Sequence, residues 1–436
     1  MTVSVNQHVV ADEQASHWKE RKLKFISDVR TSNVDKHIVE CEIPVRLCNY
    51  TDVYYNEKIT PGMPFMQGSA TESEIERFGL KKGQVLLTKD SESWEDIAVP
   101  AYVTETMPEV VCGYHLAVIE PDSDEVDGRF LSWLAQSPVL NDQFKLAAKG
   151  VTRFGLSQYA LKNAVIEVPS LEYQSKVAAF LDRKTAEIDT LIAKKRRLLD
   201  LLAEKRTALI TRTVTKGLNP DAPMKDSGIE WLGEIPAHWS VQPVYTRYSV
   251  QLGKMLDERR ITGDSLIRYL RNVDIQWDKI NYEGLPKMDI GESEYERYLV
   301  EEGDLLVCEG GEIGRSAIVG EQLEFTAYQK ALHRLRPIHE AEHPRYMFYT
   351  LFAAAKNGVL SVGGVSTISH LTAEQLKRLR FPTPPGNEQR RIANCLDRSL
   401  VELDEAYKLV DAAIEQLHEY RSALITNAVT GQIQVA

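Results

Sequence analysis

Cysteine is scarce in this chain. Five are spread over 436 residues, with no CxxC pair and no nearby histidine at ligand spacing. Neither a zinc site nor a disulfide framework is therefore indicated, and a reducing compartment is expected. No apolar run reaches the roughly 18 residues that a membrane helix needs, and the N-terminal residues lack the basic and apolar blocks of a signal peptide. We expect a cytoplasmic protein without membrane contact.

Catalytic motifs are also missing. The chain has no GxxxxGK[ST] phosphate loop, no GxGxxG after a strand, no HExxH, no GxSxG and no NPPY-like tetrapeptide. The nearest candidate is EGGEIGR, Glu309 to Arg315, whose glycines are more typical of a tight turn between strands than of phosphate binding. We expect no catalytic residue, no metal and no cofactor bound by this chain.

Basic residues are outnumbered by acidic ones, which gives a formal net charge of −11. Non-specific binders of polyanions usually carry a basic surface, so the balance argues against that class. It does not exclude DNA, because a local basic face can bind DNA while acidic surface faces protein partners.

One segment is present twice. Leu171–Thr215 aligns without a gap to Gly386–Thr430, and 16 of the 45 positions are identical, where chance gives about 3. The segments that precede the two copies also resemble each other, although more weakly. His17-Trp18 returns as His238-Trp239, and LKKGQVL at 80–86 resembles VEEGDLL at 300–306. The whole chain is therefore internally duplicated.

Both copies carry apolar residues at alternating steps of three and four, the pattern of a coiled-coil helix. About 45 residues at 1.5 Å each make a helix of roughly 65 Å, whose narrow apolar stripe is best covered by the other copy. The first copy contains the basic run Lys194–Arg197 and the second is acidic, which favours their pairing, although such runs also occur on solvated faces. Two independent surface helices are the alternative. The predicted seam residues are Val177, Leu181, Ile188, Leu198, Leu202, Leu209, Ile392, Leu396, Leu403, Val410, Leu417 and Leu424.

The predicted fold class is α+β. Two mixed α/β domains are separated by two long helices that form an antiparallel coiled coil, with a pseudo-two-fold internal repeat. Short β-rich runs and one amphipathic helix, near 128–136 and 345–355, are expected in each globular domain. The predicted divisions are domain 1 at 17–170, the central helix at 171–217, a linker at 218–236, domain 2 at 237–385 and the C-terminal helix at 386–430.

This arrangement resembles the specificity subunit of type I restriction-modification systems. The motifs that carry the resemblance are PGNEQRRIANCLD (385–397), RSALITNAVTGQI (421–433), GIEWLGEIPAHW (228–239) and KDSESWEDIAVPAYV (89–103). The resemblance covers essentially the whole chain. One departure is Tyr173, which stands where the second copy has Glu388, and it puts the local start of the first helix in doubt.

The resemblance implies a division of labour. Each globular domain would be a target-recognition domain that reads one half of a bipartite site in double-stranded DNA. The paired helices would hold the two domains at a fixed separation, and half-sites one helical turn apart lie roughly 34 to 36 Å from each other. The implied partners are two methyltransferase subunits, which would carry S-adenosylmethionine, and motor-nuclease subunits in the restricting complex. The chain itself would not be an enzyme.

Base readout needs arginine or lysine for guanine and asparagine or glutamine for adenine, while phosphate contacts set the register. For any single residue, a solvated surface charge or a turn explains its presence equally well. The candidate DNA-binding residues are Lys89, Asp90, Ser91, Lys149, Thr152, Arg153, Arg268, Arg271, Asn272, Arg315, Gln329, Lys330 and Thr367.

Two other functions stay open on sequence grounds. A scaffold that uses the coiled coil to assemble other subunits would show no salt-dependent affinity for DNA, whereas a DNA-recognition subunit would. A hydrolase within the globular domains is the second alternative, because catalytic constellations are recognised by geometry and can escape a motif search.

Overall fold

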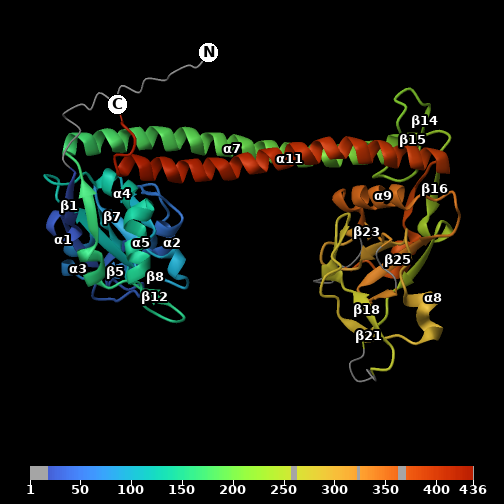
Figure 1. The fold of residues 1–436 in the computed structure, drawn as a ribbon, viewed down its shortest axis with the longest axis horizontal. Coiled ribbons are helices and arrows are strands. Elements are labelled where there is room, and N and C mark those ends of the chain that lie inside the picture. The colour runs from blue at the N-terminus through green and yellow to red at the C-terminus, as the bar shows by residue number, and fades with distance from the viewer. Residues whose placement is uncertain (1–17, 257–262, 322–324, 362–369, 436) are drawn as a thin grey trace, which may run out of the picture. The chain divides into compact units, whose positions relative to one another are not determined.

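Two compact units make up the protein. Unit 1 contains residues 1–195 and 412–436, and unit 2 contains residues 196–411. Each unit combines one globular domain with part of each long helix (Figure 1). The predicted fold class, two mixed α/β domains with two long helices, is confirmed. The structure is a computed structural model that describes residues 18–256, 263–321, 325–361 and 370–435.

The duplicated segments are the two long helices, α7 (Leu171–Lys216) and α11 (Gly386–Val429). Just past each helix a glycine adopts the left-handed conformation, with φ of 73° at Gly217 and 70° at Gly431. Glycine accepts this conformation because it lacks a Cβ, and it ends a helix for that reason. Within the described ranges, no helix is long and apolar enough to cross a membrane, α7 and α11 included.

A tryptophan covers the end of each long helix. A Cβ at Gly217 would lie 3.1 Å from the ring of Trp239, and one at Gly431 would lie 2.6 Å from the ring of Trp18. Any other residue at either glycine would therefore have to displace an aromatic ring. The tryptophan of each repeated His-Trp dipeptide supplies this ring, which gives the repeated tryptophan a structural role in both units.

Within each unit the two helices run antiparallel and share an ion pair. In unit 1, Arg421 Nε lies 3.0 Å from Asp189 Oδ1. In unit 2, Arg206 pairs with Asp404. In both pairs the residue numbers sum to 610, and the repeat offset of 215 converts one pair into the other. The same contact is thus present twice, as a pseudo-two-fold repeat requires. Because these pairs are partly exposed, they orient the helices more than they stabilise them.

The departure at Tyr173 changes the local contact at the start of α7. The hydroxyl of Tyr173 donates to the carbonyl of Ile433, 3.4 Å away, and its ring meets that of Trp18 edge to face. At the equivalent position in unit 2, Glu388 lies 2.8 Å from His238 Nε2. Helix α7 nevertheless begins at Leu171, so the substitution leaves the helix start in place.

Burial along the predicted seam varies. Deep burial occurs where a globular domain also packs on the helices, as in the unit 2 core that joins Ile392 and Leu396 to Phe381. Leu198 keeps 43% exposure, which differs from the predicted seam, because two helices alone cover a narrow stripe. The other seam residues are buried (Val177, Leu181, Ile188, Ile392, Leu396 and Leu424) or half-buried (Leu202, Leu209, Leu403, Val410 and Leu417).

The globular domain of unit 1 contains two main sheets, with strand orders β2-β11-β7-β9-β4 and β5-β3-β10-β6. Strand β7 is buried along its whole length, as expected for a central strand with an unbroken apolar run. The strands are β1 (Lys19–Lys22), β2 (Ser27–Thr31), β3 (Ile43–Cys48), β4 (Lys58–Ile59), β5 (Met66–Ala70), β6 (Gly79–Leu80), β7 (Val85–Thr88), β8 (Asp90–Ser91), β9 (Pro100–Val103), β10 (Met107–Cys112), β11 (Leu116–Pro121), β12 (Phe154–Gly155) and β13 (Val165–Val168). The helices are α1 (Leu23–Ile26), α2 (Tyr50–Tyr54), α3 (Glu72–Phe78), η1 (Trp94–Asp96), α4 (Gly128–Gln136), α5 (Pro138–Ala147) and α6 (Gln158–Asn163).

The globular domain of unit 2 repeats this plan, with sheets β17-β25-β22-β23 and β21-β18-β24. Its strands are β14 (Met224–Asp226), β15 (Glu234–Pro236), β16 (Ser240–Pro243), β17 (Tyr248–Leu252), β18 (Leu266–Leu270), β19 (Ile275–Gln276), β20 (Lys279–Ile280), β21 (Lys287–Asp289), β22 (Leu305–Cys308), β23 (Ser316–Ile318), β24 (Thr326–Tyr328), β25 (Leu332–Pro337) and β26 (Arg380–Thr383). Its helices are η2 (Val244–Thr246), η4 (Asn272–Asp274), η5 (Glu292–Glu294), α8 (Tyr295–Tyr298), α9 (Pro344–Lys356), η6 (Val359–Ser361) and α10 (Ala373–Arg378).

The two globular domains correspond strand by strand. Antiparallel pair β1–β13 matches β16–β26, and parallel pair β3–β10 matches β18–β24. Main-chain bonds match too: Leu156 N–H donates to the Lys89 carbonyl at 2.8 Å, and Leu371 N–H donates to the Glu309 carbonyl at 2.8 Å. The predicted internal duplication is therefore present in the fold, and β22 and β23 are joined by the tight turn predicted at 309–315.

The predicted linker at 218–236 is more ordered than its composition suggests. Strands β14 and β15 pair within it as an antiparallel hairpin. Leu232 and Ile235 are buried in the core of unit 2 beside Trp239. These apolar residues hold the segment against the domain, which is why a run rich in proline and glycine has a fixed structure here.

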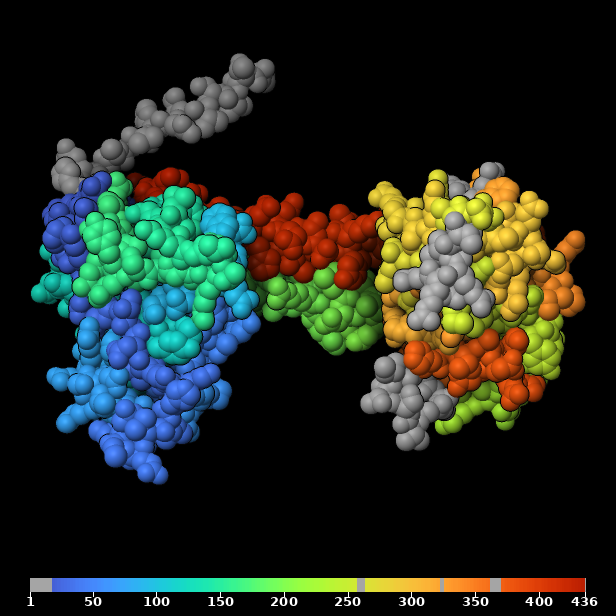
Figure 2. Space-filling model, turned by 90° about the horizontal axis from the view of Figure 1, so that it is seen from below, coloured from blue at the N-terminus to red at the C-terminus, as the bar shows by residue number. Residues whose placement is uncertain are grey.

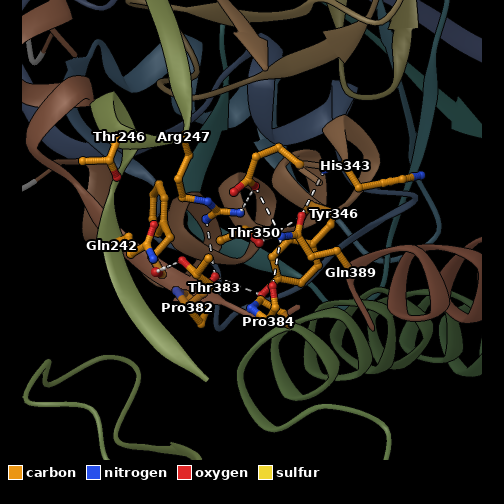
Figure 3. Close-up of polar contacts among 12 residues, drawn as sticks. Gln242, Thr246, Arg247, His343, Tyr346, Thr350, Pro382, Thr383, Pro384 and Gln389 are labelled. Carbon is orange, nitrogen blue, oxygen red and sulfur yellow. Dashed lines mark hydrogen bonds and ion pairs between the residues drawn. The ribbon is translucent and has the colours of Figure 1, made fainter. Parts of the chain in front are cut away.

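A buried glutamine anchors the start of each long helix. Gln389 Oε1 accepts from the His343 N–H at 3.0 Å, and its Nε2 donates to the Pro384 carbonyl at 3.1 Å (Figure 3). The buried ion pair of Arg247 and Glu342, 2.5 Å apart, lies beside this amide. A buried amide with partners at both ends fixes the geometry around it, since losing any one bond leaves a desolvated polar group.

Gln174 makes the same contacts in unit 1. Its Oε1 accepts from the Asp127 N–H at 2.8 Å, and its Nε2 donates to the carbonyls of Pro169 and Glu125 at 2.9 and 3.1 Å. Asp127 and His343 are the N-cap residues of α4 and α9. Each glutamine therefore joins a long helix to the amphipathic helix of its domain.

Replacing Gln389 by leucine is expected to destabilise unit 2. The substitution leaves the His343 N–H and the Pro384 carbonyl buried without partners, which costs about 1–3 kcal/mol for each unsatisfied group. Thermal unfolding of Gln389→Leu, compared with Glu402→Ala on the exposed face of α11, measures the effect. Equal melting temperatures for the two variants would contradict the anchoring role.

Candidate nucleic-acid interface

Two predicted segments of unit 1 meet at the end of the domain that lies away from the helices. Strand β8 pairs with β12, which brings Asp90 opposite Gly155 and Ser91 opposite Phe154. Lys149 bonds Gly155 through the main chain in both directions, at 3.1 and 2.9 Å. Residues about sixty positions apart in sequence therefore share one surface. This surface lies at the outer end of the domain, which faces the viewer in Figure 2.

A chain of side chains crosses this surface. The ring of His115 places Nδ1 at 2.9 Å from Asp90 Oδ2 and Nε2 at 3.2 Å from Arg153 Nη2. Lys89 Nζ also lies 3.5 Å from the Asp90 carboxylate. His115 was not predicted from the sequence, because its partners Asp90 and Arg153 lie in remote parts of the chain. Its place in the turn between β10 and β11 was the signal available.

Tyrosines of helix α2 extend the same surface. Tyr50 and Tyr54 stack with ring centroids 5.3 Å apart. Burial raises the pKa of Tyr50, while a hydrogen bond to Ser91 opposes that change. A hydrogen bond to Asp96 raises the pKa of Tyr54 to about 12. Aromatic rings at a polar surface suit contacts with bases or sugars, but nothing in the local sequence of α2 marked them.

In unit 2 the structure brings Asn272 and Arg315 together. Arg315 Nη2 donates to the side-chain and main-chain oxygens of Asn272 at 2.8 and 3.0 Å. The Asn272 amide in turn donates to the Gly310 carbonyl at 3.0 Å. Both ends of the amide are engaged within the domain, so contact with a base would require these bonds to exchange. Arg271 pairs with Asp274, which raises the pKa of its guanidinium.

The remaining candidates of unit 2 lie in different settings. Arg268 is exposed on β18. Gln329 uses its main chain to bond Leu270 at 3.0 Å, and Lys330 beside it is exposed. Thr367 lies outside the described residues. Its predicted counterpart Thr152 is exposed in the loop that carries Arg153.

Unit 1 and unit 2 each carry a polar cluster, and the two clusters occupy equivalent places in the duplicated fold. The cluster of unit 1 contains Tyr50, Asp90, His115 and Arg153, and that of unit 2 contains Asn272 and Arg315. Asn49 and Arg271 both follow the strand that pairs in parallel with its neighbour. Each main-chain N–H bonds the carboxylate three residues later, Asp52 or Asp274, at 2.7 Å. Tyr50 therefore corresponds to Asn272. One scaffold presents a tyrosine, a histidine and an arginine in one domain and an asparagine and an arginine in the other.

A family profile described as the type I restriction modification DNA specificity domain matches residues 16–199 and 275–409. Over 379 residues, the chain is 24% identical to the protein named as the MjaX type I restriction enzyme specificity subunit of Methanocaldococcus jannaschii, covering 84% of this chain and 81% of that protein. Over 331 residues, it is 23% identical to the EcoBI type I restriction enzyme specificity subunit of Escherichia coli, covering 72% and 68%.

Solved structures share the fold. A chain from a structure of a type I restriction-modification system aligns with 94% of this chain and 97% of its own length, with a TM-score of 0.66 and 15% identity. The HsdS subunit from Thermoanaerobacter tengcongensis aligns over 95% and 97%, with a TM-score of 0.55 and 16% identity. The architecture of two mixed domains with two long helices is therefore shared with known proteins.

Unit 2 is expected to lose stability in mild acid because of His333. Its Nε2 donates to the Leu371 carbonyl at 2.7 Å, and its Nδ1 is buried without a partner among the residues that the structure describes. Burial lowers its pKa. The unfolded chain, with a histidine pKa near 6.5, therefore binds the proton first. The free energy of unfolding should fall as pH drops below about 6.5, with a slope of up to about 1.4 kcal/mol per pH unit.

Unfolding of the wild type and of His333→Gln between pH 7.5 and 5 measures this contribution. Glutamine keeps a donor for Leu371 and does not titrate, so its stability should depend less on pH. The exposed His339 provides the matched control, as His339→Gln. An unchanged pH dependence in His333→Gln would rule out this linkage.

Proposed function

Because this chain belongs to the type I restriction-modification DNA specificity family, we propose that each of its globular domains reads one half of a bipartite DNA site. The observation that carries the proposal is the pair of polar clusters, which occupy equivalent places in one duplicated scaffold yet differ in composition. Two copies of one surface with different side chains suit two different half-sites. The named relatives are specificity subunits, so the chain acts with the other subunits of a complex and is not itself an enzyme.

The readout would come from the loops at the outer end of each domain. In unit 1, Lys89, Lys149 and Arg153 supply positive charge beside the polar groups of Asp90 and Ser91. In unit 2, Arg268, Arg271 and Lys330 supply charge around Asn272 and Arg315. Arginine contacts with guanine and asparagine contacts with adenine read sequence, whereas lysine contacts with phosphate set position. With a net charge of −11, the isolated chain should bind DNA weakly.

The long helices would set the spacing between the half-sites and bind the partner subunits. Support comes from the duplicated ion pair, because a pseudo-two-fold surface offers the same site to two identical partners. Those partners would be two methyltransferase subunits carrying S-adenosylmethionine, joined by motor-nuclease subunits in a restricting complex. An adenine inside the duplex cannot be reached, so the methyltransferase would flip it out for methylation.

Methylation mapping tests the function directly. The chain is co-expressed with the methyltransferase subunit of its own system in a host without DNA methylation, and modified adenines are located by sequencing. Two short specific blocks around a fixed non-specific gap are expected. A stable complex that leaves DNA unmodified at every such split site would favour the scaffold alternative.

Shortening both helices is expected to shorten the gap. Residues 198–204 of α7 lie opposite residues 406–412 of α11, because facing residue numbers sum to 610 in both ion pairs. Removing both segments therefore shortens the two helices equally and keeps both ion pairs. Seven residues at 1.5 Å each span about 10 Å, which corresponds to about three base pairs. Both half-sites should stay the same in the methylation map. Altered half-sites with an unchanged gap would contradict the spacing role, and a one-helix deletion serves as the mismatched control.

A further inference from the structure

One arginine on the outer surface of unit 1 is held by a neutral partner. The Nδ1 of His115 faces Asp90 Oδ2 at 2.9 Å, and its Nε2 faces Arg153 Nη2 at 3.2 Å. Because a carboxylate accepts, the imidazole donates to Asp90 from Nδ1. Arg153 Nη2 lies 3.0 Å from Nδ1 and 3.2 Å from Nε2, so it contacts the face of the ring rather than the lone pair of one nitrogen. A cation against the ring face fits the neutral imidazole.

Charge along this chain of side chains is unevenly balanced. The Asp90 carboxylate has two partners, Lys89 at 3.5 Å and His115. Arg153 lies against the uncharged ring, and no described carboxylate forms an ion pair with it. Its positive charge therefore stays uncompensated at an exposed position, while Asp90 is already neutralised.

Arg153 also keeps unused donors. Within the described residues its only side-chain contacts with polar atoms come from Nη2, which leaves the hydrogens of Nη1 and Nε available for a ligand. A planar guanidinium held from one side presents a two-donor fork on the other. The bidentate acceptor that this fork matches in the DNA major groove is guanine, through O6 and N7.

The duplicated domain shows that folding does not require this chain of side chains. The Lys89 N–H donates to the His115 carbonyl at 3.0 Å, and at the same place in unit 2 the Glu309 N–H donates to the Ala331 carbonyl at 3.0 Å. Ala331 thus replaces His115, and Gly310, which follows Glu309, replaces Asp90. The same main-chain bonds form without either side chain. What His115 and Asp90 add to unit 1 is a contact for Arg153.

We propose that Arg153 reads a guanine in the half-site of unit 1, and that His115 and Asp90 are positioning residues that hold its guanidinium for that contact. The inference rests on the proposed function, in which unit 1 reads one half of a bipartite site. Asp90 orients the imidazole, the imidazole holds one nitrogen of Arg153, and the free side of the fork reaches the base edge. Lysine in place of Arg153 would keep the charge and lose the fork.

Methylation maps of the co-expressed complex test the assignment. Arg153→Ala should relax one guanine of the unit 1 half-site to several bases, lowering discrimination there by roughly 5- to 150-fold. Arg153→Lys should keep overall methylation closer to the wild type while relaxing the same position. The other half-site and the gap should be unchanged. Arg77→Ala, at an exposed arginine of helix α3 in the same unit, is the matched control and should leave the map unchanged.

Variants of His115 separate positioning from packing. His115→Ala should weaken discrimination at the guanine assigned to Arg153, because the guanidinium loses its support. His115→Gln keeps a donor for Asp90 and a planar group for the guanidinium to lie against, so it should restore part of that discrimination. A role in packing alone would instead lower thermal stability and methylation at every site, without a change confined to one base.

The outcomes distinguish the inference from the function beneath it. A wild-type complex that methylates no split site overturns both. A wild-type split motif that is unchanged in Arg153→Ala, or changed at a base other than guanine, overturns the assignment and leaves the proposed function standing. If Arg153→Ala fails to assemble, Arg153→Lys and His115→Gln carry the comparison. A guanine relaxed in the first and partly restored in the second supports the assignment.

Discussion

A buried side-chain amide holds each long helix to its globular domain, and the arrangement of each unit depends on it. Gln174 and Gln389 lie in the first turn of their helices with both ends of the amide engaged. The partners are Asp127 and Pro169 in one case and His343 and Pro384 in the other. Leaving a buried amide without partners costs folding free energy. The start of the long helix, the strand before it and the amphipathic helix must therefore come together around the glutamine. The outer loops of each domain are then carried at a defined distance from the helices.

The contacts that build the scaffold and those that face outward are separated. The glutamine anchors, the glycine–tryptophan helix ends and the ion pairs of Arg206 and Arg421 recur in both halves. The side chains at the outer ends differ between the halves. Repetition thus marks what holds the protein together, and divergence marks what distinguishes its two domains. The net charge of −11 belongs to the chain as a whole, whereas the basic residues Lys89, Lys149 and Arg153 are gathered at the outer end of unit 1.

Much of the fold was predictable from the sequence. The repeat located both long helices, because a gapless alignment with a coiled-coil rhythm is a local signal that extends over many turns. The helices at 128–136 and 345–355 and the turn at 309–315 were also predicted and are confirmed. The order in the 218–236 segment was not predicted, since Leu232 and Ile235 become core residues only through contact with distant strands.

The outer surface was partly predictable. Charged residues in the loops at 89–91 and 149–153 could be selected by type, and the structure brings them together through β8 and β12. His115 and Tyr50 were missed because their neighbours come from remote parts of the chain. Asn272 was selected, yet its engagement by Arg315 and Gly310 is visible only in three dimensions. Whether the selected residues bind DNA stays a prediction.

The loops after β7 and β22 are fixed by main-chain atoms. Lys89 and Glu309 each use a backbone N–H and a carbonyl to hold the loop, so the bonds form whichever side chain follows. Aspartate occupies the next position in one domain and glycine in the other, over the same backbone connections. Amino-acid replacement at such a position alters the chemistry displayed outward and leaves these main-chain bonds in place. The two halves of a duplicated chain can therefore diverge at this position without losing the bonds that hold the loop.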